Sequence, residues 1–127
     1  VDRLMGDAVV VDVSAKASAQ ADYQVSEADF TAWEQAHGTI PEGAIVLIRT
    51  DYSTRWPDAL SYLGTAERGD AAVARLHFPG LDPAGARWLA EERRVKAVGI
   101  DTASIDYGQS TLFETHRALY ERNIPGF

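Results

Sequence analysis

The sequence of 127 residues predicts one domain of the α/β class. Three short apolar runs, at residues 8–13, 44–48 and 95–100, are rich in the β-branched residues that favour buried strands. Segments with helix start and stop signals lie between and after these runs, and local hairpin signals are few. The predicted order is strand, helix, strand, loop, helix, strand, helix, with no internal repeat and no low-complexity segment.

The first strand is expected at residues 8–13. Asp12 interrupts this run, and we expect it at the strand end, because a carboxylate inside a buried strand needs a hydrogen-bonding partner. Residues 14–24 are small and polar and predict a loop.

A helix is expected to begin at Ser26, because Ser26 and Asp29 have the spacing of a capping box. Gly38 is a typical helix stop. His37 lies in the last turn, where a cation suits the helix dipole, so we assign it a structural role.

Residues 40–43 predict a turn that leads into the second strand at 44–48. Aromatic residues then gather in residues 52–64, an irregular loop that either covers a pocket or packs on the body of the domain. Residues 65–76 are polar and rich in Ala, which predicts a short helix.

Residues 77–80 predict a tight turn, since they contain Pro and Gly in succession. Asp82 followed by Pro83 predicts a helix start, with the cap first and Pro at the first helical position. The inner face of this helix is expected to hold Ala86, Leu89 and Ala90. Residues 91–94 are all charged and predict a solvated end.

A closing helix is expected at residues 111–122, after the third strand and a polar loop. Apolar and aromatic side chains share one predicted face with a histidine, at three- and four-residue spacing: Leu112, Phe113, His116, Leu119 and Tyr120. This pattern leaves two interpretations of His116, as a buried core histidine or as a ligand or catalytic group.

The composition narrows the class of protein. The formal net charge of −7 argues against a nucleic-acid or anionic membrane surface, which would need clustered Lys and Arg. The absence of cysteine excludes disulfides, Cys-based zinc sites and a Cys nucleophile. No apolar run approaches the roughly 18 residues of a membrane span, and no signal-peptide pattern opens the sequence. We therefore expect a cytoplasmic protein with no nucleic-acid or membrane partner.

The ends at Val1 and Phe127 lack the polar, frayed composition of natural termini, so we expect part of a longer chain.

Polar side chains follow the third strand in the order Asp101, Thr102, Ser104, Asp106, Gln109 and Ser110. Ligands of α/β folds collect at the carboxyl ends of strands, so this loop is a candidate site. Alternatively, Asp101 and Asp106 make local turn hydrogen bonds, and Ser110 or Thr111 caps the next helix. The three histidines form no His-x-x-x-His or His-Glu-x-x-His pair, so spacing alone completes no metal site.

Four ordered parts of the sequence nevertheless match the pattern of one family. They are residues 2–14 (DRLMGDAVVVDVS), 48–53 with 55–57 (IRTDYS and RWP), 77–81 (HFPGL), and 99–106 (GIDTASID) followed by His116. In this order and spacing they resemble the metal-dependent cyclase family, which includes bacterial kynurenine formamidase and isatin hydrolase. The resemblance covers nearly the whole chain.

This resemblance implies a swivelling β/β/α-type fold, incomplete in this chain, and metal-dependent hydrolysis of an amide C–N bond in an aryl formamide or cyclic amide. The family's upstream motif, His-x-Gly-Thr-His-x-Asp-x-Pro-x-His, and its glutamate after the closing helix are not in the sequence. His116 matches the family's later histidine, so the resemblance assigns it as a metal ligand and catalytic group. Residues 1–127 would then form a single domain that is part of a larger cyclase-family domain.

The implied cofactor is a divalent ion, zinc or manganese, because both suit His and carboxylate ligands. Phe78 and Trp56 are expected to wall the substrate pocket, and Ser104 to make a polar contact with the substrate. The expected partners are a small-molecule amide and either further copies of the chain or a complementary chain that supplies the missing ligands.

Two other functions remain open. The absent ligand motif favours a non-catalytic cyclase-fold homologue that serves as a binding or scaffolding module. The aromatic loop instead favours a region that serves oligomerisation, since such loops reach across interfaces.

Overall fold

The structure is a computed structural model that describes residues 5–127. Its elements in chain order are β1 (Ala8–Asp12), α1 (Ser14–Ala19), β2 (Gln24–Val25), α2 (Glu27–His37), β3 (Ile45–Arg49), the 3-10 helix η1 (Tyr52–Arg55), α3 (Ala59–Leu63), α4 (Asp70–Val73), β4 (Gly80–Leu81), α5 (Pro83–Glu91), β5 (Ala97–Ile100) and α6 (Glu114–Tyr120). Asp2, Arg3 and Leu4, which begin the first segment resembling the cyclase family, lie outside the described residues.

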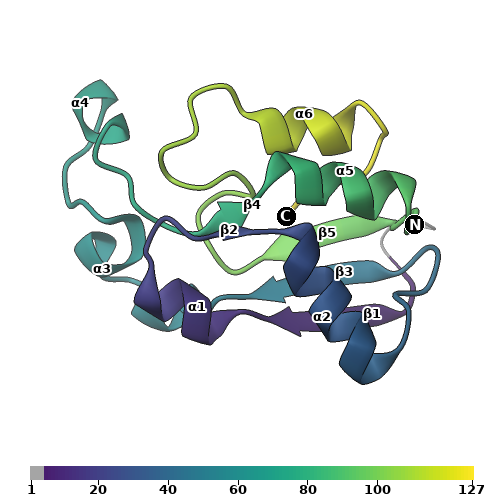
Figure 1. The fold of residues 1–127 in the computed structure, drawn as a ribbon. Coiled ribbons are helices and arrows are strands. Elements are labelled where there is room, and N and C mark those ends of the chain that lie inside the picture. The colour runs from purple at the N-terminus through teal and green to yellow at the C-terminus, as the bar shows by residue number, and fades with distance from the viewer. Residues whose placement is uncertain (1–4) are drawn as a thin grey trace.

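Two parallel sheets organise the fold (Figure 1). The larger sheet has the strand order β1-β3-β5, and β2 pairs with β4 separately. In the larger sheet, the register places Val10 beside Leu47 and Leu47 beside Gly99. The tail lies along β5, where Phe127 N donates to Val98 O over 3.0 Å and Ile100 N donates to Phe127 O over 2.8 Å. The predicted α/β class and its three strands are confirmed.

The main core lies on one face of the larger sheet. Its innermost side chains come from the three strands and from α2, α5 and α6: Val11, Val46, Val98, Phe30, Leu89 and Leu119, each at most 2 % exposed. Strand side chains alternate between faces, so their neighbours point the other way. Val10, on that second face, is 51 % exposed.

The two long helices begin where the sequence predicts. Ser26 and Asp29 form the capping box of α2, and Gly38 ends that helix at φ 91°. At α5, the Asp82 carboxylate accepts from Ala84 N and Gly85 N over 3.1 and 3.2 Å. Within residues 5–127, no helix is both long and apolar enough to cross a bilayer.

The expected loop at residues 14–24 is wrong, because this stretch contains α1 and the first residue of β2. Ala and Lys have high helix propensity, and Ala17 is 1 % exposed in a second, small core with Tyr52 and Phe78. That core also fixes the aromatic segment, which contains η1 and α3 and packs on the body through Tyr52. The short helix expected within residues 65–76 is confirmed as α4.

The tight turn expected at residues 77–80 is also wrong. Residues 77–79 have no turn or bend, and Gly80 begins β4, where its N donates to Tyr23 O over 3.1 Å. Long-range pairing with the strand β2 therefore overrides the local turn signal of Pro and Gly.

The charged end of α5 is exposed at Glu91, Glu92 and Arg94, as predicted, but Arg93 is half-buried. Arg93 donates to both carboxylate oxygens of Glu34 over 2.6 and 2.9 Å, and its guanidinium lies 4.2 Å from the centre of the Trp88 ring. This contact joins α2 to α5, so Arg93 has a structural role.

Candidate functional site

The buried carboxylate of Asp106 is the centre of the polar loop that follows β5. The residue is 3 % exposed. Its Oδ1 accepts from Ser110 Oγ and Thr115 N, each over 3.1 Å. Its Oδ2 accepts from His116 N over 3.2 Å and also contacts Nδ1 of the His116 ring. The first amides of a helix have no partner within the helix, so Asp106 serves as the acceptor for the start of α6.

His116 lies at the surface beside this carboxylate, with its side chain 30 % exposed. The rings of Phe113 and Tyr120 flank it at centroid distances of 6.0 and 5.3 Å, each nearly perpendicular to the imidazole. Within residues 5–127, Nε2 of His116 has no hydrogen-bond partner. The structure therefore presents an imidazole that is held at one nitrogen and open at the other.

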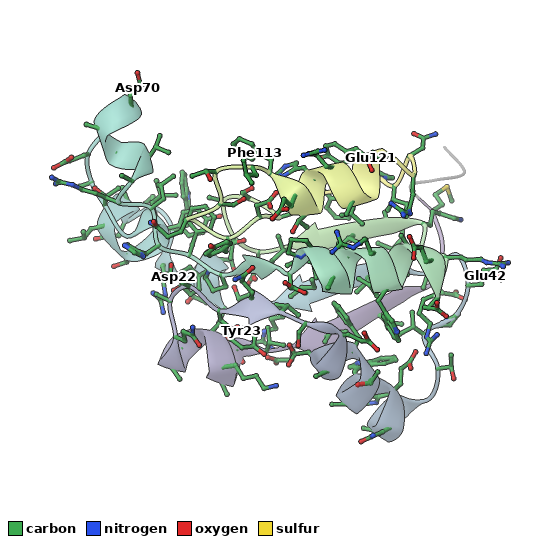
Figure 2. All side chains as sticks on the ribbon, turned by 45° about the horizontal axis from the view of Figure 1, so that its top comes forward. Asp22, Tyr23, Glu42, Asp70, Phe113 and Glu121 are labelled. Atoms are coloured by element: carbon green, nitrogen blue, oxygen red, sulfur yellow. The ribbon has the colours of Figure 1, made fainter. Side chains whose placement is uncertain are left out.

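The expected apolar face of the closing helix is wrong. The helix spans Glu114–Tyr120, and its buried residues are Thr115, Ala118 and Leu119. Leu112, Phe113 and Tyr120 are instead 65 %, 57 % and 51 % exposed. Phe113, at the N-cap, has φ 50°, so the helix starts later than its spacing predicts, and Phe113 lies on the outer surface (Figure 2).

The alternative interpretation of the loop carboxylates is also corrected. Asp101 makes distant contacts, accepting from Thr50 N and Thr50 Oγ1, each over 2.7 Å, at the end of β3. Neither Ser110 nor Thr111 caps α6, because Ser110 donates to Asp106 and Asp106 takes the helix amides.

The structure brings Ser104 and Phe78 to the same loop as Asp106, but not Trp56. Ser104 Oγ accepts from Asp106 N over 3.3 Å, and Phe78 O accepts from Gly108 N over 2.9 Å. The Phe78 side chain itself is 4 % exposed in the small core. Trp56 is 68 % exposed and packs edge-on against Tyr62. Among the described residues, no hydrogen bond or ring contact joins any of these three side chains to His116.

The described residues can supply one ligand of a metal site, but not a complete site. No group of three or more His, Asp or Glu side chains in residues 5–127 is placed to hold an ion. His116 suits a divalent ion through its open Nε2, while all the acceptor capacity of Asp106 faces protein donors.

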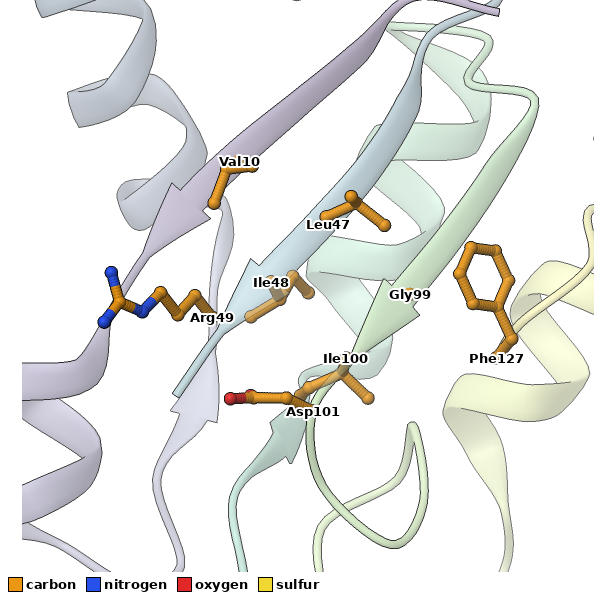
Figure 3. A pocket seen from close by; sticks show the side chains of 8 residues that line it. All are labelled: Val10, Leu47, Ile48, Arg49, Gly99, Ile100, Asp101 and Phe127. Atoms are coloured by element: carbon orange, nitrogen blue, oxygen red, sulfur yellow. The ribbon is translucent and has the colours of Figure 1, made fainter. Parts of the chain in front are cut away.

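An apolar hollow of about 300 Å³ lies on the second face of the larger sheet (Figure 3). Val10, Leu47 and Gly99 lie across its floor, and the Phe127 ring stands at its side. Arg49 and Asp101 lie at its polar end, where the strands finish.

Sequence reasoning included Asp106 among the polar residues of a candidate loop but gave it no specific role. It lies ten positions before His116, so helical spacing cannot connect them. One feature of the sequence could have indicated its role. Asp106 lies between a buried strand and a helix that carries a histidine, and loops in this position supply acceptors to the first amides of the helix.

Known proteins with similar sequences and structures share one family. The Cyclase family model matches residues 1–107. The isatin hydrolase of Roseibium aggregatum is 29 % identical over 130 aligned residues, which cover 99 % of this chain and 47 % of that protein.

Two solved structures agree. Isatin hydrolase A from Ralstonia solanacearum has 37 % identity and a TM-score of 0.82, over 94 % of this chain and 44 % of that one. An isatin hydrolase bound to the product analogue thioisatinate has 29 % identity and a TM-score of 0.84, over 98 % and 46 %. The chain thus spans about half the length of the relatives it matches. Because the family model matches most of its residues and the folds agree, this chain belongs to the cyclase family.

Proposed function

We propose that this chain is part of a hydrolase that opens the C–N bond of a cyclic amide, with a divalent metal ion as cofactor. The observation that carries the proposal is His116, held at Nδ1 by Asp106 and open at Nε2. The similarity to isatin hydrolases supports the cyclic amide as the substrate class. An aryl formamide is the second substrate class, because its hydrolysis breaks the same kind of bond.

The proposed reaction consumes one water. The water oxygen bonds to the amide carbonyl carbon and the C–N bond breaks. One proton of the water passes to the nitrogen and the other is released to solvent, which leaves a carboxylate and an amine in one ring-opened product. The chemistry that a divalent ion supplies when bound is polarisation of a carbonyl and a lower pKa for water.

The resemblance assigned His116 both as a ligand and as a catalytic group, and these roles compete for one lone pair. An Nε2 that coordinates an ion has no lone pair left to accept a proton. We propose the ligand role, because Asp106 occupies the other ring nitrogen, as carboxylates do beside metal-bound histidines.

Histidine substitutions in the intact protein test the function. We expect His116→Ala to lower kcat/KM for isatin by about 100-fold or more and to lower the bound metal per protein. His37→Ala is the matched control, because His37 ends α2 and its ring lies tilted against Trp33, with the ring centroids 4.7 Å apart. It should keep both activity and metal. Activity is followed by the absorbance change on ring opening, and metal by elemental analysis, which also separates zinc from manganese.

The outcomes separate the candidate functions. Lost activity with retained metal in His116→Ala would support the catalytic-group role over the ligand role. The intact protein could also hydrolyse neither isatin nor an aryl formamide, whichever divalent metal is added. That result would overturn the proposed hydrolase function and favour a non-catalytic binding module.

The substrate contacts of Phe78, Trp56 and Ser104 remain proposals. Ser104 has the best support, since its hydroxyl lies beside the backbone of Asp106. Assembly into a homo-oligomer, or with a chain that supplies the other ligands, is likewise proposed, because residues 5–127 hold no complete ligand group.

A further inference from the structure

We infer that Asp106 is a positioning residue that fixes the tautomer of His116, so that Nδ1 carries the proton and Nε2 presents its lone pair. The carboxylate faces four donors, which are Ser110 Oγ, Thr115 N, His116 N and the imidazole Nδ1. An ionised carboxylate only accepts hydrogen bonds, so the imidazole must supply the proton in its contact with Oδ2.

The same carboxylate ties this orientation to the fold. Besides the imidazole, its three donors are a hydroxyl of the loop that precedes α6 and two backbone amides at the start of α6, and the residue is 3 % exposed. The position of the carboxylate is therefore set by backbone amides before the imidazole meets it. Rotation of the ring about its χ angles would break the Nδ1 contact, so the contact limits the directions in which Nε2 can point.

This inference rests on the proposed function only in one respect, namely that Nε2 binds the metal ion. The tautomer itself is measured without metal or substrate, so failure of one claim is distinct from failure of the other.

The test is nitrogen-15 NMR of the His116 ring in the intact, metal-free protein at about pH 9, where an ordinary histidine is neutral. We expect a protonated Nδ1 and an unprotonated Nε2 in the wild type. In Asp106→Asn the side-chain amide donates toward the ring, so we expect the proton to move to Nε2. Zn²⁺ or Mn²⁺ titrated into the same variant should bind about 10- to 100-fold more weakly.

Asp101→Asn is the matched control. Asp101 lies in the same loop and accepts from Thr50 N, Thr50 Oγ1 and Ser53 Oγ, and within residues 5–127 it has no hydrogen bond to a histidine. It should lower stability while leaving the His116 ring signals unchanged. A protonated Nε2 in the wild type would overturn the inference even if Asp106→Asn does not fold. Unchanged ring signals in a folded Asp106→Asn would overturn it as well.

Discussion

At the scale of single residues, Asp29 shows how a buried carboxylate stays charged. Its side chain is 2 % exposed, and burial alone would raise its pKa. Hydrogen bonds from Lys16, Ser26 N and Tyr23 outweigh burial and hold the pKa of Asp29 below its ordinary value of 3.8. A group whose pKa is lowered by folding stabilises the protein above its unfolded pKa. That stabilisation is lost as the pH falls through the folded value.

We expect Asp29→Asn to lower the free energy of unfolding by about 1–3 kcal/mol at pH 7, because the ion pair with Lys16 disappears. The difference from the wild type should shrink as the pH falls below 3.8 toward the lowered pKa, because the wild type then loses the same charge. Urea unfolding at several pH values measures both effects.

The control for this pH series is Glu42→Gln. Glu42 lies 3.7 Å from Arg94, and both side chains are 72 % exposed, so the change should stay under about 1 kcal/mol. A loss in Asp29→Asn that is the same at every pH would contradict the assignment of the charge.

At the scale of elements, two strand glycines differ in what they approach. A Cβ on Gly80 would lie 2.1 Å from Tyr107 N, so β4 and the loop of Asp106 touch through their backbones. A Cβ on Gly99 would lie 2.7 Å from Phe127 Cε2 and 3.0 Å from Leu47 Cδ2, which are the ends of side chains. Side-chain ends move aside more easily than backbone does.

We therefore expect Gly80→Ala to cost about 3 kcal/mol or more, and Gly99→Ala about 1 kcal/mol. Chemical unfolding of both variants gives the comparison. Equal costs would show that the approach of β4 to the loop is looser than the structure has it.

Elements with local signals were predictable from the sequence, and those that depend on distant contacts were not. The starts of α2 and α5 follow from caps that act within three residues. By contrast, α1 depends on the burial of Ala17 against Tyr52 and Phe78, and β4 depends on β2.

The candidate site divides in the same way. The resemblance identified His116, whose ring the structure holds beside a buried carboxylate. The role of Asp106 could not be predicted, because an irregular loop brings it to His116. Such a loop has no repeating spacing of residues from which the contact could be inferred. The exposed position of Phe113 was missed, because a backbone φ of 50° there delays the helix start. Tyr120 is exposed because it lies off the buried face of the helix, which Thr115, Ala118 and Leu119 form.

At the scale of the whole molecule, the middle of the second face of the larger sheet is apolar, and no element in residues 5–127 covers Val10, which is 51 % exposed. Parallel sheets are almost always covered on both faces, and the relatives are about twice as long as the matched stretch. We therefore expect further polypeptide of the intact protein to cover Val10 and Leu47.

The test compares two valines of similar exposure in this chain. Val10 is 51 % exposed in β1, and Val73 is 53 % exposed in α4, which projects from the body (Figure 1). Val10→Asp should lower the Tm of the intact protein by about 5 °C or more, and Val73→Asp by much less. Equal shifts in Tm for the two variants would mean that this face of the sheet is exposed to solvent in the intact protein. A Tm of the wild type that rises with protein concentration would assign the cover to a second copy.

The parallel pairing of the strands has a kinetic consequence. Ala8 pairs with Ile45, Ile45 with Ala97, and Gln24 with Gly80, so each pairing in the described sheets must first close a long loop. Chains with such distant contacts refold in milliseconds to seconds rather than microseconds. Because β3 lies between β1 and β5, neither outer strand can pair with another strand of this sheet until β3 is in place. We therefore expect the placement of β3 to precede the pairing of both β1 and β5 during folding.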